Sequence, residues 1–250
     1  GRVGRSNSFS FGLLGRRASQ SREEGDLDGD EDDHLLMDET FRHPEETILN
    51  DLDFLHAEED RHTRDRNLPV PIMSAASEIL SDHVAAQLVL KLPLILQFDN
   101  WIKLYSILGD GTDLTSFFTK IKYHQYTLLV VETTEGDIFG GFADTNWIIS
   151  SSFYGGGQCF LFRIDEDMVA VFGWSSMNDL FMWSNFDNVA MGGGGGGFGF
   201  VLDCDFSTGS TATCETFANP PLIKNSSGTF EVKNVEVWGF SSGQSRANAA

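Results

Sequence analysis

The chain of 250 residues is long enough for one sizeable domain with appendages, or at most for two small domains. Its net charge of −20 repels nucleic-acid phosphates and anionic lipids, which argues against both as direct partners and favours a basic face on another protein. Its three cysteines, Cys159, Cys204 and Cys214, form no CxxC pair and leave at least one thiol unpaired, which favours a reducing compartment.

The beginning of the chain differs in composition from the remainder. Residues 1–70 hold only four aromatic side chains but eighteen of the thirty-seven acids, so they lack the apolar surface that would offset the entropy of ordering. We therefore expect residues 1–73 to form a disordered acidic tail, and we expect the same of the short polar segment 241–250. The longest apolar stretch, residues 88–96, is too short to span a bilayer.

Four features stand out within this tail. Residues 1–22 contain five arginines and no acid, which is typical of a mitochondrial presequence as well as of an unmodified basic arm. RRAS at 16–19 makes Ser19 a candidate phosphosite for a basophilic kinase. The acidic run at 26–39 fails the frame of a calcium loop, and the apolar spacing at 44–60 predicts a short amphipathic helix that docks on the domain or on a partner.

The remaining sequence predicts helices first and strands afterwards. Apolar spacing indicates one helix over 74–90, capped by Ser74 or Ser77, and a second around 114–121. The segments that read as strands are 126–133, 138–144, 159–164, 169–174, 180–184, 197–203 and 230–240. Short strands with the helices gathered at the start favour an antiparallel α+β domain over alternating βαβ units.

Six consecutive glycines interrupt this pattern at Gly192, Gly193, Gly194, Gly195, Gly196 and Gly197. The run lacks the Lys-Ser/Thr pair of a phosphate-binding loop, and the residues that follow it read as a strand rather than a helix. Strands on both sides argue against a linker between domains. We therefore expect a structural role inside the fold, in which positive φ or close backbone approach requires glycine beneath aromatic neighbours.

Several long motifs resemble the TLDc domain of the oxidation resistance protein family. They are YSILGDGT (105–112), TLLVVETTEGDIFGGFAD (127–144), FYGGGQCFLFR (153–163), MGGGGGGFGFVLDCD (191–205), CETFANPPL (214–222) and VEVWGF (235–240). The resemblance covers residues 74–240. It implies a two-sheet antiparallel β-sandwich flanked by a few helices, a role in resistance to oxidative stress, and binding to the vacuolar-type proton ATPase.

The residues themselves give little support for catalysis. The domain has two histidines, His83 and His124, and no GxSxG or HExxH motif. A pair of His124 with Cys204 or Cys214 is conceivable, but Asp203 and Asp205 place negative charge beside Cys204, which disfavours a reactive thiolate.

Four acids remain candidates for function, namely Glu132, Asp203, Asp205 and Glu215. Acids of this kind can bind a metal or transfer protons, but acids at strand ends more often cap turns or face solvent.

We therefore expect a non-catalytic regulatory module without a cofactor or metal. The alternative is a metal- or thiol-dependent enzyme of oxidative stress defence. We expect a monomer whose partners are subunits of the vacuolar-type proton ATPase, with neither nucleic-acid binding nor direct membrane insertion. The expected location is the cytoplasm, including lysosomal or vacuolar membranes reached through the partner, with mitochondria as the lesser alternative.

Overall fold

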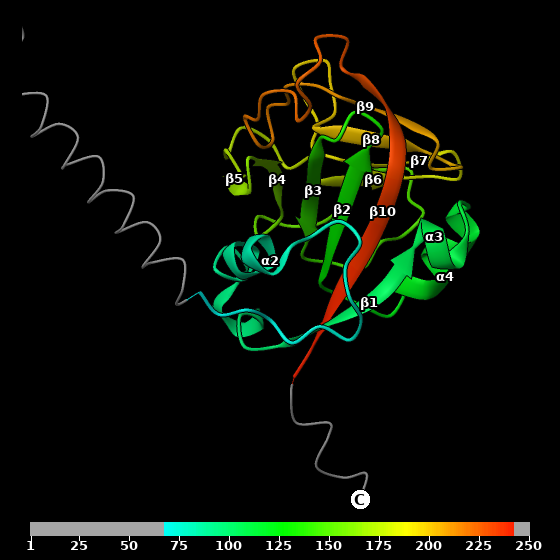
Figure 1. The fold of residues 1–250 in the computed structure, drawn as a ribbon. Helices are drawn as coiled ribbons and strands as arrows, with labels where there is room; N and C mark the ends of the chain where they lie inside the picture. Colours follow the sequence, from blue (N-terminus) through cyan, green and yellow to red (C-terminus); the bar gives the residue numbers. More distant parts are fainter. Residues whose placement is uncertain (1–67, 243–250) are drawn as a thin grey trace, which may run out of the picture. The chain divides into compact units, whose positions relative to one another are not determined.

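The computed structural model describes residues 68–242, which are mostly antiparallel β-sheet with a few helices (Figure 1). The helical elements are α2 (Asp82–Val89), the 3₁₀ turn η1 (Leu94–Leu96), α3 (Ile107–Asp110) and α4 (Leu114–Ile121). The strands are β1 (Asn100–Ser106), β2 (Thr127–Thr133), β3 (Ile138–Ala143), β4 (Phe160–Asp165), β5 (Met168–Phe172), β6 (Met182–Ser184), β7 (Asn188–Met191), β8 (Phe200–Asp203), β9 (Thr208–Thr211) and β10 (Thr229–Ser241). The expectations for the tail before residue 68, including the helix at 44–60 and Ser19, and for the segment after 242, lie outside the described residues.

One long strand, β10, connects all the others. Its first residues, Thr229–Glu231, pair with β9, and its later residues pair with β2 on one edge and β1 on the other. The hydrogen-bonded order is β5-β4-β3-β2-β10-β9-β8-β7-β6, and every pairing is antiparallel. The antiparallel α+β class is therefore confirmed, whereas a clean division into two separate sheets is not seen, because β10 belongs to both halves.

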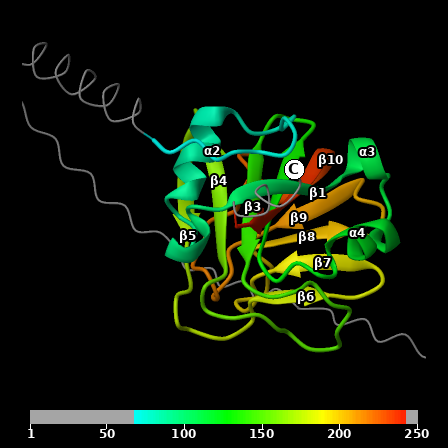
Figure 2. The same ribbon diagram turned by 90° about the horizontal axis from the view of Figure 1, so that it is seen from below.

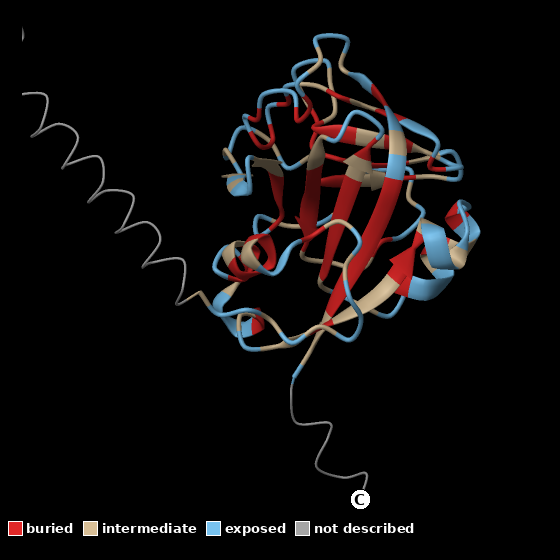
Figure 3. Cartoon of the chain, viewed as in Figure 1, coloured by how far each residue is buried: buried red, intermediate tan, exposed pale blue. Residues whose placement is uncertain are grey.

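Side chains from the two halves meet in a common core. Figure 3 marks the buried residues of the strands in red. The rings of Phe139 on β3 and Phe200 on β8 lie 5.9 Å apart, centroid to centroid. At Gly141 on β3 a Cβ atom would lie 2.4 Å from the Sδ atom of Met191 on β7, so a larger residue here would force the Met191 side chain to shift. A second cluster, which includes Leu88 of α2, packs around Trp238 on the other side of β10. Figure 2 shows α2 and α4 on different sides of the strands.

The sequence predicted some helix boundaries correctly and others wrongly. The helix predicted around 114–121 is confirmed as α4, in which the Asp113 carboxylate accepts a hydrogen bond from the Ser116 amide at 2.8 Å. The helix predicted over 74–90 is wrong in its first half, since α2 begins at Asp82. The physical reason is Ser77, whose hydroxyl accepts from the amide of Leu80 and donates to the carboxylate of Glu236, holding a turn there instead.

Glu236 anchors this turn from inside the sheet. It is fully buried on β10 and accepts hydrogen bonds from the Glu78 amide, the Lys103 ammonium and the Trp238 indole at 2.9, 2.9 and 3.1 Å. Burial raises the pKa of Glu236, and the Lys103 ammonium supplies the opposing charge. The segment before α2 is thereby fixed to the sheet without being helical.

Strands β1, β7 and β9 were not predicted from the sequence, and the strand predicted over 197–203 begins only at Phe200. None of the helices within residues 68–242 is long and apolar enough to cross a bilayer.

Candidate functional site

The six glycines form the connection between β7 and β8, which we call the glycine loop (residues 192–197). Four of its residues have a φ in the left-handed region: Gly192 at 77°, Gly194 at 83°, Gly195 at 67° and Gly196 at 91°. Side chains other than glycine are strained in this region. The loop enters the core at Gly192 and Gly193, which are buried, and exposes its tip at Gly195 and Gly196.

A buried threonine fixes the inner part of the glycine loop. The Gly193 amide donates to the Thr216 hydroxyl at 2.9 Å, and this hydroxyl lies 2.7 Å from the side-chain oxygen of Asn178. The amides of Glu215 and Thr216 in turn donate to the Gly193 carbonyl. Three segments far apart in sequence are thus joined around one hydroxyl group, and hydrogen bonds hold the inner part of the loop although it is rich in glycine.

Two polar side chains cover the middle of the loop. A Cβ atom on Gly194 would lie 2.5 Å from both the amide nitrogen of Asn178 and a carboxylate oxygen of Glu215. The same two groups are 3.4 Å apart, within hydrogen-bonding distance. Glu215 is exposed. A candidate acid and the glycine run, identified separately in the sequence, therefore meet in one place.

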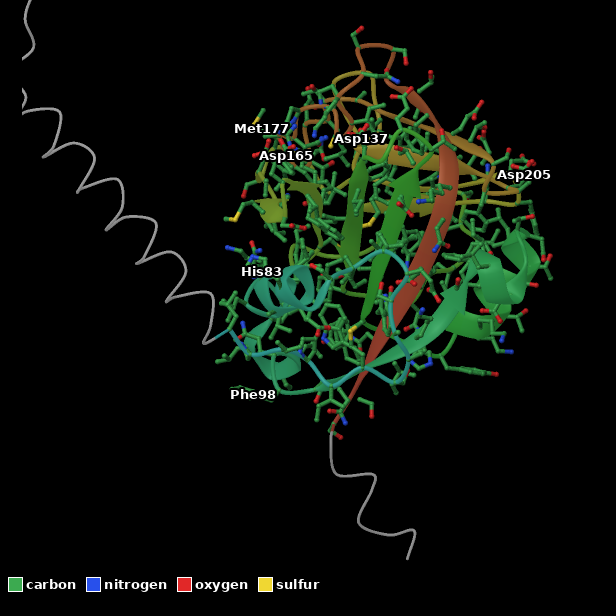
Figure 4. The ribbon with its side chains drawn as sticks, viewed as in Figure 1. His83, Phe98, Asp137, Asp165, Met177 and Asp205 are labelled. Atoms are coloured by element: carbon green, nitrogen blue, oxygen red, sulfur yellow. The ribbon has the colours of Figure 1, made fainter. Side chains whose placement is uncertain are left out.

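Apolar side chains border this place. Met177 is 72% exposed and projects outward in Figure 4. Trp174 is partly exposed, and its indole donates to the Asn178 carbonyl at 2.8 Å. Asp179 is also exposed. We call the glycine loop together with Trp174, Met177, Asp179 and Glu215 the glycine-loop surface.

The other candidate acids lie elsewhere. Glu132 on β2 pairs with Lys233 of β10 at 2.7 Å. Asp203 accepts from the amide group of Asn188 at 3.1 Å and from the Thr208 hydroxyl, and Asp205 caps its own turn. Asp203 and Asp205 follow β8, whereas the glycine loop precedes it, and Figure 4 shows Asp205 and Met177 on opposite sides. Within residues 68–242 no three His, Cys, Asp or Glu side chains are grouped to hold a metal ion.

A comparison with known protein families tests the resemblance that the motifs suggested. The family description "TLDc domain" fits residues 73–241 of this chain. The chain belongs to the TLDc domain family. Mouse "Nuclear receptor coactivator 7" is 33% identical over 172 residues, which are 68% of this chain and 18% of that protein. "Oxidation resistance protein 1" of Xenopus tropicalis is 34% identical over 171 residues, 68% of this chain and 19% of that protein. The chain thus spans about a fifth of the length of these relatives.

Two of the three thiols of this TLDc domain are poorly suited to react. Burial and the nearby Asp144 carboxylate raise the pKa of Cys159 to about 12, and its sulfur lies 3.3 Å from an oxygen of that carboxylate. Burial also raises the pKa of Cys214. Cys204 is exposed. Within residues 68–242 no hydrogen bond joins His124 to Cys204 or Cys214; the ring of His124 lies against Gly239, and Cys214 lies against Gly192.

Sequence reasoning missed Trp174 and Met177 of the glycine-loop surface, Thr216 beneath it, and the buried Glu236. Thr216 was overlooked because a threonine next to an acid carries no distinctive pattern, although it lies in the motif CETFANPPL. Trp174 was assigned to a strand, and Met177 to none. Glu236 could have been found, because it is an acid in the middle of the apolar run VEVW, where a buried charge requires a partner.

Proposed function

We propose that this TLDc domain is a non-catalytic interaction module that binds the vacuolar-type proton ATPase and supports resistance to oxidative stress. The observation that carries the proposal is the glycine-loop surface, where exposed apolar and acidic side chains stand on a hydrogen-bonded base. The relatives named for oxidation resistance support the stress role. The ATPase as partner rests on the resemblance of the motifs.

The chemistry of the glycine-loop surface suits protein recognition. Tryptophan and methionine are enriched at protein interfaces, and a base held by internal hydrogen bonds loses little entropy on binding. The carboxylates of Glu215 and Asp179 form no ion pair within residues 68–242. They would attract a basic face, so the partner surface should carry lysine or arginine around an apolar centre.

The oligomeric state, the cellular location and the arrangement of the strands follow from the same proposal. It acts as a monomer in the cytoplasm and reaches lysosomal or vacuolar membranes through the ATPase. Its two strand groups, β5 to β2 and β9 to β6, serve as the two layers of a sandwich joined along β10. Packing of Phe139 against Phe200 between these groups supports this description.

A pull-down of the full chain from cytosol and organelle extracts tests the partner. We expect wild-type protein to recover ATPase subunits and Glu215→Lys to recover several-fold less, because the reversed charge would repel the basic partner face. The matched control is Glu231→Lys, which makes the same change at an exposed position of β10. Recovery of no ATPase subunit at low salt would contradict the proposal.

A peroxide-consumption assay separates this proposal from the enzyme alternative. A thiol enzyme would need a reactive cysteine, and Cys204 is the exposed one. We expect the purified chain and its Cys204→Ser variant to consume peroxide at the same slow rate. Turnover that disappears in Cys204→Ser alone would establish the enzyme and overturn the non-catalytic assignment.

A further inference from the structure

A second surface, distant in sequence from the glycine loop, carries several strongly exposed apolar side chains. The side chains of Ile95, Phe98 and Tyr123 are 76%, 83% and 81% exposed, and Leu94 and Leu90 add to them. Figure 4 shows Phe98 projecting outward from the body of the molecule. We call Leu90, Leu94, Ile95, Phe98 and Tyr123 the apolar face. Exposed apolar groups gathered in this way mark an interaction site more often than chance exposure.

The local structure holds these side chains outward. In the tight turn η1, Leu96 points inward and is buried, which leaves Leu94 and Ile95 facing solvent. The side-chain amide of Gln97 donates to the Leu92 carbonyl at 2.9 Å and braces the turn. The fold thus holds the turn η1 in place, because the buried side chain of Leu96 anchors it to the core.

Two residues of the apolar face, Ile95 and Tyr123, also line a groove. This groove has a volume of about 410 Å³, and its walls include Tyr126 and Phe240. Asp99 is the acid among the lining residues, and burial raises its pKa. The groove itself is of mixed polarity, since His124, Gln125 and Ser242 also line it, whereas the side chains of Ile95 and Tyr123 beside it are apolar and exposed.

Positive charge borders this face. Within residues 68–242, four of the six lysines form ion pairs with carboxylates, namely Lys103, Lys120, Lys224 and Lys233. The two without such a pair are Lys91, which follows Leu90, and Lys122, whose ammonium lies 4.6 Å from the ring centre of Tyr123. The lysines that remain available for another charge are those beside the apolar face.

We propose that the apolar face binds the surface of a bilayer that contains anionic lipids. Leucine, isoleucine and phenylalanine on a projecting turn enter the region between headgroups and acyl chains, tyrosine sits at its boundary, and the two lysines meet lipid phosphates. A projecting turn suits a bilayer better than the cleft of a protein, because its side chains diverge. This contact requires no membrane-spanning helix.

The negative charge of the whole chain opposes such contact only at long range. At physiological ionic strength the Debye length is about 8 Å, so lipid phosphates respond mainly to the charges next to them. Near the apolar face these are Lys91 and Lys122, opposed by the carboxylate of Asp99 in the groove. The net charge used in the sequence analysis averages over the molecule and conceals this local reversal.

Vesicle flotation with the full chain tests the proposal. The probes are phosphatidylcholine vesicles with and without about 30 mol % phosphatidylserine, a composition in the range of anionic cytoplasmic leaflets. We expect wild type to float with the anionic vesicles, and Ile95→Ser/Phe98→Ser to bind at least about tenfold more weakly. Lys91→Glu/Lys122→Glu should also bind anionic vesicles more weakly than wild type. Its binding to neutral vesicles should not change. The matched control is Leu108→Ser/Phe186→Ser, which removes two comparably exposed apolar side chains that lie outside both the apolar face and the glycine-loop surface.

The outcomes separate a lipid surface from a protein surface. Binding that is lost in Ile95→Ser/Phe98→Ser and kept in the control supports the proposal, provided both variants unfold at the wild-type temperature. If that variant unfolds early, Leu94→Ser/Tyr123→Ser makes the same test on two other exposed side chains. No flotation of wild type, or equal flotation of all variants, overturns the proposal. So does loss of ATPase recovery in Ile95→Ser/Phe98→Ser without any change in flotation, which would assign the face to a protein.

Discussion

At Gly192 two constraints coincide, a left-handed backbone and a lack of space. Its φ is 77°, and an added Cβ would lie 2.6 Å from the sulfur of Cys214 and 2.9 Å from the ring of Phe217. Gly196 has a similar φ of 91°, but nothing lies within 4 Å of its Cβ position. The two glycines therefore separate backbone strain from steric exclusion.

We expect Gly192→Ala to lower the free energy of unfolding by about 2 to 4 kcal/mol, the sum of strain and overpacking. Gly196→Ala should cost only about 1 kcal/mol, because strain alone acts there. Urea denaturation of both variants measures the difference. Equal losses would show that the loop yields at Gly192 and is not packed as described.

The three cysteines should differ in reactivity. Burial raises the pKa of Cys159 to about 12 and shields its sulfur, so the thiolate that iodoacetamide requires is scarce at pH 8. Cys214 is buried likewise, whereas Cys204 is exposed. Mass spectrometry of the native chain should show alkylation at Cys204 alone, and at all three after denaturation. Rapid native alkylation of Cys159 would contradict its buried, hydrogen-bonded position.

At the scale of elements, β10 both joins the strands and anchors the turn before α2 through Glu236. Without Lys103, the buried carboxylate of Glu236 has no ammonium beside it. It must then either stay charged, which destabilises the folded state, or take up a proton. We expect Lys103→Met to lower the free energy of unfolding by about 3 to 5 kcal/mol. Adding Glu236→Gln to this variant should recover part of the loss, because the uncompensated charge disappears.

A double-mutant cycle by chemical denaturation measures this coupling. The matched control is Lys233→Met, which breaks the pair with Glu132, a pair whose lysine is largely exposed, and should cost about 1 kcal/mol or less. Strictly additive effects of Lys103→Met and Glu236→Gln would mean that the two groups do not interact as the geometry indicates.

The elements that were predictable are those whose local pattern agrees with their surroundings. Helix α4 has a capping aspartate and an apolar stripe, and the hairpin of β2 and β3 has buried runs around a Glu-Gly-Asp turn. Strand β9, with the sequence TGST, has no apolar pattern and exists because β8 and β10 pair with it on both edges. The site was less predictable, because Glu215 joins the glycine loop through Thr216, a tertiary contact without a sequence signal.

At the scale of the whole molecule, charge is unevenly distributed. Acids such as Glu215 and Asp179 surround the glycine loop, whereas the unpaired lysines lie beside the apolar face. Binding to a basic protein face should therefore weaken with salt. We expect the Kd for the vacuolar-type proton ATPase to rise about tenfold between roughly 0.05 and 0.5 M salt, because screening shortens the range of attraction. Biolayer interferometry at several salt concentrations measures this Kd. A Kd that does not change with salt would contradict a contribution of charge to the binding.

The most direct test of the central claim is the affinity of the full chain for purified vacuolar-type proton ATPase, compared with Trp174→Ala/Met177→Ala. We predict measurable binding by wild type and a loss of at least about 2 kcal/mol in the variant, as for central interface residues. Leu108→Ala, an exposed apolar position on α3, should bind like wild type. Absence of binding, or equal affinity of wild type and Trp174→Ala/Met177→Ala, would contradict the claim that the glycine-loop surface is the site of function.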